Sequence, residues 1–332
     1  MPADRIALEE HFWTPELREL RRGHDVLSEP KLCARLTDLG ELRIAEMDAA
    51  GIDLQIISHV EPATQNFEPA EAVRLACAAN DLLHQAIIAH PTRFAGFAAL
   101  PTPDPQAAAR ELERAVGALG FKGAMVHGLT RGHFLDEKPF WPIFEAAQRL
   151  DVPIYLHPAT PHPDVIAAYY EGYPSMVRVG HGFTSEMSAA AIRLVLSEVF
   201  EVFPRLQIIL GHLGETLPFL LPRIDRYVSR QMQGRTFAES LRKHFYFTTG
   251  GAFTHAALQC TIETIGIERL MFAVDWPFHS NLDGTAFIET APIGEDAKAK
   301  IFAGNARALL RLEHDPEKWI PVFGKDHAPP IM

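Results

Sequence analysis

The pattern of apolar and polar residues predicts short buried strands that alternate with amphipathic helices. Apolar runs without a helical period, typical of strands, lie at residues 6–8, 54–58, 94–100, 123–126, 153–156, 206–210, 245–249 and 270–274. Helical spacing is found between them, at residues 14–22, 42–48, 69–89, 104–119, 140–150, 185–203, 214–231, 255–265 and 295–310. The segments 23–36 and 158–183 have no clear period and are expected to be loops over a site.

Eight strands that alternate with helices predict a single α/β domain, a (β/α)₈ TIM barrel with inserted loops over its C-terminal mouth. A doubly wound sheet is the competing fold, but no glycine-rich dinucleotide fingerprint follows the first strand. No repeat or change in composition marks a second domain, so residues 1–332 are expected to form one. The tail after about residue 316 is expected to pack on the barrel or on a neighbouring subunit.

Composition narrows the class of protein. Hydrophobic residues make up 47% and charged residues 22% of the 332 residues, which allows a large core. The net charge of −11 argues against a nucleic-acid partner, because no basic excess exists to neutralise phosphates. Three scattered cysteines, the absence of an apolar leader and the absence of a membrane-length apolar run together predict a cytoplasmic protein with no membrane partner.

Candidate chemistry gathers at the ends of the predicted strands. In a barrel these ends converge on one mouth, where catalytic groups sit. Side chains alternate along a strand, so Glu9 and His11 point to one side and Glu10 to the other. Several buried histidines at equivalent positions are hard to explain by packing, since each would need its own partner. The strand-end groups are Glu9, His11, His127, His157, His212 and Asp275.

Four of these groups form a candidate metal-ligand set. Two carboxylates and two imidazoles make a mixed, fairly hard site that suits one divalent ion, Zn²⁺, Mn²⁺ or Mg²⁺, with positions open for substrate. The predicted ligands are Glu9, His11, His157 and Asp275. His212 is then left for general acid–base work or for bonding to Asp275.

Several segments resemble signatures of the amidohydrolase superfamily, in its amidohydrolase 2 group, and of its aromatic-acid decarboxylase branch, which contains γ-resorcylate and 2,3-dihydroxybenzoate decarboxylases. The resemblance covers nearly the whole chain in order. It is carried by Leu8-Glu9-Glu10-His11-Phe12, Phe94-Ala95-Gly96-Phe97-Ala98-Ala99-Leu100-Pro101, Tyr155-Leu156-His157-Pro158, Ile209-Leu210-Gly211-His212-Leu213-Gly214-Glu215, Asp275-Trp276-Pro277-Phe278 and Gly304-Asn305-Ala306.

The resemblance implies an amidohydrolase-like barrel and the same four metal ligands. Hydrolases of this superfamily carry His-x-His on the first strand, and Glu9-x-His11 is similar to the decarboxylase variant instead. It also implies that His212 and Glu215 position and protonate Asp275, and that the chain forms a homodimer or homotetramer.

The expected reaction is the non-oxidative, reversible decarboxylation of an ortho-hydroxylated aromatic acid, which makes the protein a carboxy-lyase. Direct loss of CO₂ would leave a costly aryl carbanion, whereas prior protonation of the carboxyl-bearing carbon lets CO₂ leave as the ring is restored. Asp275, protonated through His212, is the candidate acid. This chemistry needs the metal but no organic cofactor.

Substrate contacts are expected from three further residues. Arg223 resembles the family's carboxylate-binding arginine, although a solvated arginine paired with Asp225 explains it equally well. Phe278 is expected to pack on the substrate ring or to be a core aromatic, and His127 is expected to touch ring substituents. His59, also at a strand end, is better explained as structural.

Two other functions compete. A metal-dependent hydrolase or hydratase acting on a lactone or ring-cleavage product would use the same ligands, with Asp275 as a base towards water. A non-catalytic metal-binding or scaffold protein would leave His212 and Glu215 without a purpose. The first-strand glutamate favours the decarboxylase.

Overall fold

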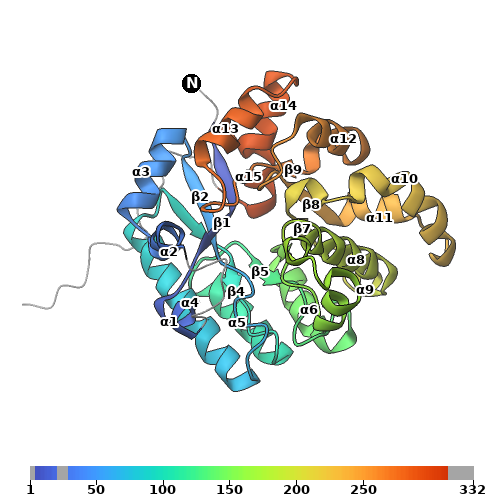
Figure 1. The fold of residues 1–332 in the computed structure, drawn as a ribbon, viewed down its shortest axis with the longest axis horizontal. Coiled ribbons are helices and arrows are strands. Elements are labelled where there is room, and N and C mark those ends of the chain that lie inside the picture. The colour runs from blue at the N-terminus through green and yellow to red at the C-terminus, as the bar shows by residue number, and fades with distance from the viewer. Residues whose placement is uncertain (1–3, 21–28, 313–332) are drawn as a thin grey trace, which may run out of the picture.

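Parallel strands at the centre of the molecule are surrounded by a ring of helices (Figure 1). The computed structural model describes residues 4–20 and 29–312. Each neighbouring pair of strands within the two sheets is parallel. The strands are β1 (Ile6–Phe12), β2 (Leu54–His59), β3 (Phe94–Gly96), β4 (Ala98–Ala99), β5 (Ala124–His127), β6 (Ile154–His157), β7 (Ile208–Leu210), β8 (Phe245–Thr248) and β9 (Leu270–Met271).

These strands close into the predicted (β/α)₈ barrel. They form a three-stranded sheet, β1-β2-β3, and a six-stranded sheet, β4 to β9. Only Phe97 separates β3 from β4, and its amide donates to the carbonyl of Ile57 at 2.9 Å, so the two are parts of one interrupted strand. The first and last strands meet where the amide of Leu8 donates to the carbonyl of Phe272 at 3.0 Å.

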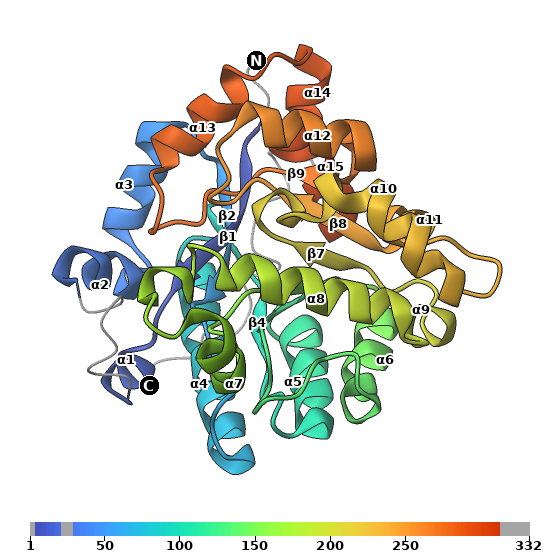
Figure 2. The ribbon, with the colours of Figure 1, turned by 45° about the vertical axis from the view of Figure 1, so that its right-hand side comes forward.

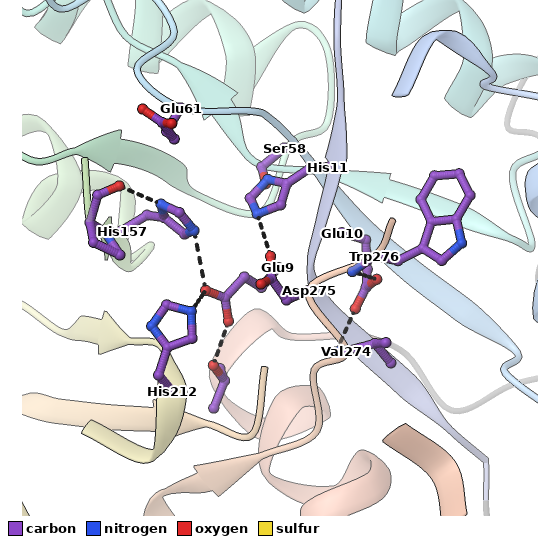
Figure 3. Close-up of polar contacts among 12 residues, drawn as sticks. Glu9, Glu10, His11, Ser58, Glu61, His157, His212, Val274, Asp275 and Trp276 are labelled. Carbon is purple, nitrogen blue, oxygen red and sulfur yellow. Dashed lines mark hydrogen bonds and ion pairs between the residues drawn. The ribbon is translucent and has the colours of Figure 1, made fainter. Parts of the chain in front are cut away.

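Glu10 strengthens the junction between the first and last strands. Its buried carboxylate accepts hydrogen bonds from the amides of Val274 at 2.9 Å and Trp276 at 3.1 Å (Figure 3). The guanidinium of Arg43 lies 4.0 Å from the ring centroid of Trp276 and donates to the carbonyl of His11 at 2.5 Å. Glu10 therefore points away from Glu9 and His11, as alternation predicts, and has a structural role.

Most predicted helices are present, and their ends follow local chemistry. Gly51 takes a left-handed conformation, φ 65°, at the end of α3, and Asp104 accepts a hydrogen bond from the amide of Ala107 at the start of α5. The helices are α1 (Pro15–Leu20), α2 (Pro30–Thr37), α3 (Glu41–Ala50), α4 (Pro69–Ala89), α5 (Pro105–Gly117), α6 (Trp141–Leu150), α7 (Pro163–Val165), α8 (Gly182–Leu196), α9 (Val199–Val202), α10 (Leu217–Val228), α11 (Phe237–His244), α12 (His255–Ile265), α13 (Asn281–Glu289), α14 (Glu295–Ala299) and α15 (Asn305–Leu310).

Some sequence-based boundaries were wrong. The second half of the predicted loop 23–36 is helix α2, which Glu29 caps by accepting from the amides of Lys31 and Leu32. The predicted helix 185–203 is interrupted between α8 and α9 at Ser197, and α11 and α13 were not predicted. The loop 158–183 contains the short helix α7, and in Figure 2 the chain from α7 to α8 crosses in front of the strands. Residues 21–28 and the tail after residue 316 lie outside the described residues.

Two apolar layers hold the barrel. Side chains from successive strands, including Ile56, Met125 and Ile209, fill its interior, and a larger layer packs between the strands and the helices. This packing fixes the strand ends, so the side chains that follow β1, β6, β7 and β9 face a common mouth. Among residues 4–20 and 29–312, no helix is long and apolar enough to cross a membrane.

Candidate metal centre and active site

Four side chains from three separate parts of the barrel meet at its mouth. Glu9 and His11 lie on β1, His157 ends β6, and Asp275 follows β9. One potential ligand atom from each lies within 4.8 Å of those from the other three (Figure 3). His11 Nε2 is 3.2 Å from Asp275 Oδ1, and His157 Nε2 is 3.5 Å from Glu9 Oε1. The residues that the sequence predicted as ligands are thus placed together.

The atoms that face each other in this cluster fit a divalent cation. Glu9 Oε1, His11 Nε2 and Asp275 Oδ1 are buried, and none has a hydrogen-bond partner. Leaving such atoms unpaired in a buried site is costly, and a cation that accepts their lone pairs removes that cost. Two carboxylate oxygens and two imidazole nitrogens suit Zn²⁺ or Mn²⁺, and Mg²⁺ less well because it prefers oxygen.

The carboxylate of Glu9 is fixed from behind. Its Oε2 accepts hydrogen bonds from Tyr155 Oη at 2.5 Å and Thr248 Oγ1 at 3.0 Å. A Cβ atom at Gly211 would lie 2.5 Å from Glu9 Oε1, and one at Gly250 only 2.2 Å from Oε2. Only glycine at these two positions leaves room for the carboxylate, which burial and these contacts hold with Oε1 towards the other ligands.

The imidazole ligands are also oriented by their second nitrogens. His157 Nδ1 donates to the carbonyl of Pro158 at 2.7 Å, which leaves Nε2 to face Glu9. Burial and the nearby His127 hold the pKa of His157 well below its usual range, so its Nε2 lone pair is available. His11 Nδ1 lies 3.4 Å from Ser58 Oγ.

His212 and Glu215 form an acid–base pair beside the cluster. His212 Nδ1 lies 2.7 Å from Glu215 Oε1, and His212 Nε2 lies 3.4 Å from Glu9 Oε1. Glu215 is held in turn by Thr184 Oγ1, which donates to its Oε2 at 2.7 Å. Burial lowers the pKa of His212, but the carboxylates of Glu9 and Glu215 outweigh it and raise the pKa to about 10. The two carboxylates therefore favour the protonated form of the His212 imidazole.

The backbone at this mouth is bent into the left-handed region at four chemically active residues. The φ angles are 67° at Glu9, 53° at His212, 57° at Glu215 and 70° at Asp275. Such angles cost non-glycine residues of order 1 kcal/mol or more each, and they persist where surrounding contacts over-determine them. At Glu9 the angle coincides with a register shift in the β1–β2 ladder, which alternation alone does not predict.

A cavity of about 370 Å³ opens onto this cluster. Its chemically active wall contains His157, His212, Glu215 and Asp275. Phe278 also lines it, with a ring centroid 5.9 Å from that of His11, so an aromatic ring beside the metal ligands would contact Phe278. The cavity is therefore large enough for a small aromatic acid, and Asp275 lies in its wall.

Two predicted substrate contacts do not line this cavity. Arg223 is exposed on α10, where it lines a separate surface hollow with Leu220 and Tyr227. His127 is buried behind His157, with 3.1 Å between their Nδ1 atoms, and its Nε2 lies 2.9 Å from the carbonyl of His59. Arg223 was predicted from its place in a motif and His127 from its place at a strand end. Whether either side chain reaches the cavity depends on the direction that the helix face points and on the depth of the strand end, which the sequence does not give.

Sequence reasoning missed the residues that support the ligands. Tyr155 could have been found, because it lies two residues before His157 and alternation places both on the inner face of β6. Thr248 ends β8 and gives a weaker signal. Thr184 lies just before the predicted helix that begins at residue 185, and no pattern in the sequence connects it with Glu215.

Comparisons with known proteins agree with this geometry. A family model described as amidohydrolase matches residues 11–312. A γ-resorcylate decarboxylase of Polaromonas sp. is 39% identical over 323 residues, which cover 93% of this chain and 98% of the relative. A crystal structure of a 2,6-dihydroxybenzoate decarboxylase complexed with 2,6-dihydroxybenzoate has a TM-score of 0.88 and 36% identity, covering 94% of this chain and 100% of the other.

A second solved structure adds a metal. The dihydroxybenzoic acid decarboxylase of Polaromonas sp. JS666, with bound manganese and the inhibitor 2-nitroresorcinol, has a TM-score of 0.88 and 37% identity. The match covers 96% of this chain and 100% of that protein.

Proposed function

We propose that this chain, which belongs to the amidohydrolase family, is a metal-dependent decarboxylase of ortho-hydroxylated aromatic acids of the γ-resorcylate or dihydroxybenzoate type. The enzyme is a carboxy-lyase. The observation that carries this function is the double position of Asp275, which is both in the ligand cluster and in the wall of the substrate cavity.

The residues that would hold the divalent metal are Glu9, His11, His157 and Asp275. When bound, the metal supplies Lewis-acid polarisation of the substrate's phenolic and carboxylate oxygens. The chain itself contributes the orientation of the ring, the exclusion of water and the handling of one proton. Phe278 provides the apolar contact to one face of the ring.

Asp275 delivers the proton that starts the reaction. Its protonated carboxyl group donates to the ring carbon that carries the substrate carboxylate, and a ring electron pair forms the new C–H bond. The ortho oxygen pushes electron density into that carbon. The bond to the carboxylate then breaks, CO₂ leaves, and the electron pair of that bond restores the aromatic ring. One proton is taken up for each CO₂ released.

His212 returns the proton to Asp275. Its Nδ1 is fixed by Glu215 at 2.7 Å, which keeps the ring in place with Nε2 on the side of the ligand cluster. The carboxylates of Glu9 and Glu215 favour the protonated imidazole, so His212 carries a proton at neutral pH, and this proton replaces the one that Asp275 gives to the ring carbon in each turnover. When a phenol is carboxylated, the proton moves in the opposite direction, from the ring carbon to Asp275 and then to His212.

The roles of the other predicted contacts follow from their positions. His127 touches His157 and is proposed to orient that ligand rather than to touch substrate. Arg223 is exposed on α10 and would reach a substrate only across an interface between copies of the chain. One domain over residues 1–332, a homodimer or homotetramer and a cytoplasmic location are part of the same proposal.

The deciding experiment is CO₂ release from a panel of ortho-hydroxybenzoates by metal-reconstituted protein, in parallel with lactone hydrolysis by the same preparation. The decarboxylase predicts CO₂ and phenol in equal amounts and no turnover of lactones. Lactone hydrolysis without CO₂ release would instead support the hydrolase, in which Asp275 acts as a base towards water.

A further inference from the structure

An ion pair that belongs to no step described above lies in the wall of the substrate cavity. Glu61, in the turn after β2, and Arg178, in the segment before α8, both line it. Arg178 donates through Nη2 to Glu61 Oε1 and through Nη1 to Thr160 Oγ1 at 2.9 Å. The side chain of Glu61 is only 5% exposed, and in Figure 3 it stands apart from the Glu9–His11–Asp275 group, on the side of His157.

The pair is built into the protein rather than solvated. Arg178 Nε is buried and has no hydrogen-bond partner, and its guanidinium lies 5.0 Å from the ring centroid of Phe183. Glu186 is buried nearby, and neither of its oxygens has a hydrogen-bond partner. Burial and the charge of Glu61 raise the pKa of Glu186 to about 8, so Glu186 is protonated at neutral pH. Glu61 and Arg178 then balance each other in charge.

The wall also contains Thr184, Thr216 and His279, and its other side chains beyond the metal ligands and the His212–Glu215 pair are apolar. Val179, Phe183, Ala252, Ala257 and Phe278 line the cavity with the pair. A substrate ring whose carboxylate and ortho oxygen face the metal ligands then meets mainly apolar groups, with Glu61 and Arg178 as a charged pair on the side of His157. A carboxylate acceptor and a guanidinium donor side by side match a group that both donates and accepts a hydrogen bond.

We propose that Glu61 and Arg178 recognise a second hydroxyl group on the substrate ring, in addition to the hydroxyl beside the carboxylate. The hydroxyl donates to Glu61 and accepts from Arg178. A second carboxylate is disfavoured by the charge of Glu61, and a methoxy group cannot donate. A ring with hydrogen in that place makes neither hydrogen bond and leaves the buried Arg178 Nε without a partner. This assignment rests on the proposed function, because it places the ring in the same cavity.

The first test compares kcat/KM for 2-hydroxybenzoate, for the dihydroxybenzoates that keep a 2-hydroxyl, for their methoxy counterparts and for 4-hydroxyisophthalate. At least one dihydroxybenzoate is expected to exceed 2-hydroxybenzoate and its own methoxy counterpart by about tenfold or more. Glu61→Gln is expected to remove most of that preference, because it lowers kcat/KM for the preferred dihydroxybenzoate more than for 2-hydroxybenzoate. Arg178→Met, a second variant, is expected to act in the same direction.

Glu68→Gln is the matched control, because Glu68 pairs with Arg131 in an exposed ion pair that does not line the cavity. It is expected to leave the substrate preference unchanged. Thermal unfolding of each variant shows whether a loss of preference comes from a loss of fold.

A binding measurement separates this proposal from the proposed function. Nitrophenols carry a nitro group in the place of the substrate's carboxylate, so they can bind in the cavity but cannot lose CO₂. Calorimetry with manganese-loaded protein is expected to show tighter binding of a dihydroxynitrobenzene than of 2-nitrophenol, and Glu61→Gln is expected to abolish the difference. That result with no CO₂ release from any benzoate would keep the hydroxyl site and refute the decarboxylase. Equal binding of the two phenols, no binding of either, or a preference for the dicarboxylate would overturn the hydroxyl site.

Discussion

The phenol of Tyr155 holds the carboxylate of Glu9 by a hydrogen bond of 2.5 Å between Tyr155 Oη and Glu9 Oε2. Both side chains are fully buried, and Thr248 Oγ1 shares the contact at 2.6 Å from the phenol. The bond occupies the oxygen that faces away from the ligand cluster, so it selects which oxygen of Glu9 faces the metal. Burial and the adjacent Glu9 raise the pKa of Tyr155, which keeps the phenol protonated as the donor.

Tyr155→Phe is expected to weaken manganese binding by about 10- to 100-fold, because the ligand carboxylate loses the group that orients it. The dissociation constant of manganese is measured by a metal titration that is monitored by calorimetry. Tyr246→Phe removes a phenol from β8, outside the contacts of Glu9, and serves as the control. Equal metal affinity of Tyr155→Phe and the unmodified enzyme would show that the hydrogen bond does not position Glu9.

Gly250→Ala is expected to displace the Glu9 carboxylate, since the added Cβ would lie 2.2 Å from Glu9 Oε2. The variant should retain less metal after dialysis than the unmodified protein. Manganese should also raise its unfolding temperature by a smaller amount. Gly294→Ala, at a glycine with no heavy atom within 4 Å of the new Cβ, is the control. Full metal retention by Gly250→Ala would contradict the claim that only glycine at this position leaves room for the Glu9 carboxylate.

Glu215→Gln is expected to move the high-pH limb of the kcat profile to lower pH by about one unit, because Glu215 helps to raise the pKa of His212 to about 10. The weaker hold on the proton of His212 should also lower kcat more than it changes KM. The exposed pair His133–Glu137, 3.0 Å apart, provides the control variant Glu137→Gln. An unchanged profile would remove His212 from the proton path.

Glu186 is expected to make the fold less stable as pH rises. Its folded-state pKa of about 8 lies above the ordinary value of 4.5, so the stabilisation is complete below pH 4.5 and is lost as pH rises through 8. The loss amounts to about 3–5 kcal/mol over this range. Urea unfolding of Glu186→Gln between pH 5 and 9 should therefore show a flatter dependence than the unmodified protein. If the free energy of unfolding falls with pH equally in both proteins, the ionisation of Glu186 does not cause the loss of stability.

The ligand cluster was predictable because simple rules govern it. Strand ends of a parallel barrel converge, and residues such as His157 and Asp275 directly follow apolar runs that are easy to recognise. The register shift at Glu9 left the prediction intact, since its side chain still faces His11 and His157. Helix α2 was missed because its apolar stripe is only a few residues long.

Other parts of the site depend on contacts between distant segments, which a single sequence does not reveal. The face of α10 that carries Arg223 turned out to be exposed, and helical period alone does not say which neighbour a partly polar face meets. Arg178 lies inside the stretch without period and Thr184 directly follows it, and their partners Glu61 and Glu215 come from other loops.

The most direct test of the central claim is to run the reaction in D₂O with manganese-reconstituted enzyme and with Asp275→Asn. The account predicts one CO₂ and one phenol per turnover, with a single deuterium on the carbon that carried the carboxylate, and a loss of about a thousandfold or more in Asp275→Asn. Deuterium at that carbon at an undiminished rate in the variant would contradict the role of Asp275. Product without CO₂ would contradict the decarboxylase itself.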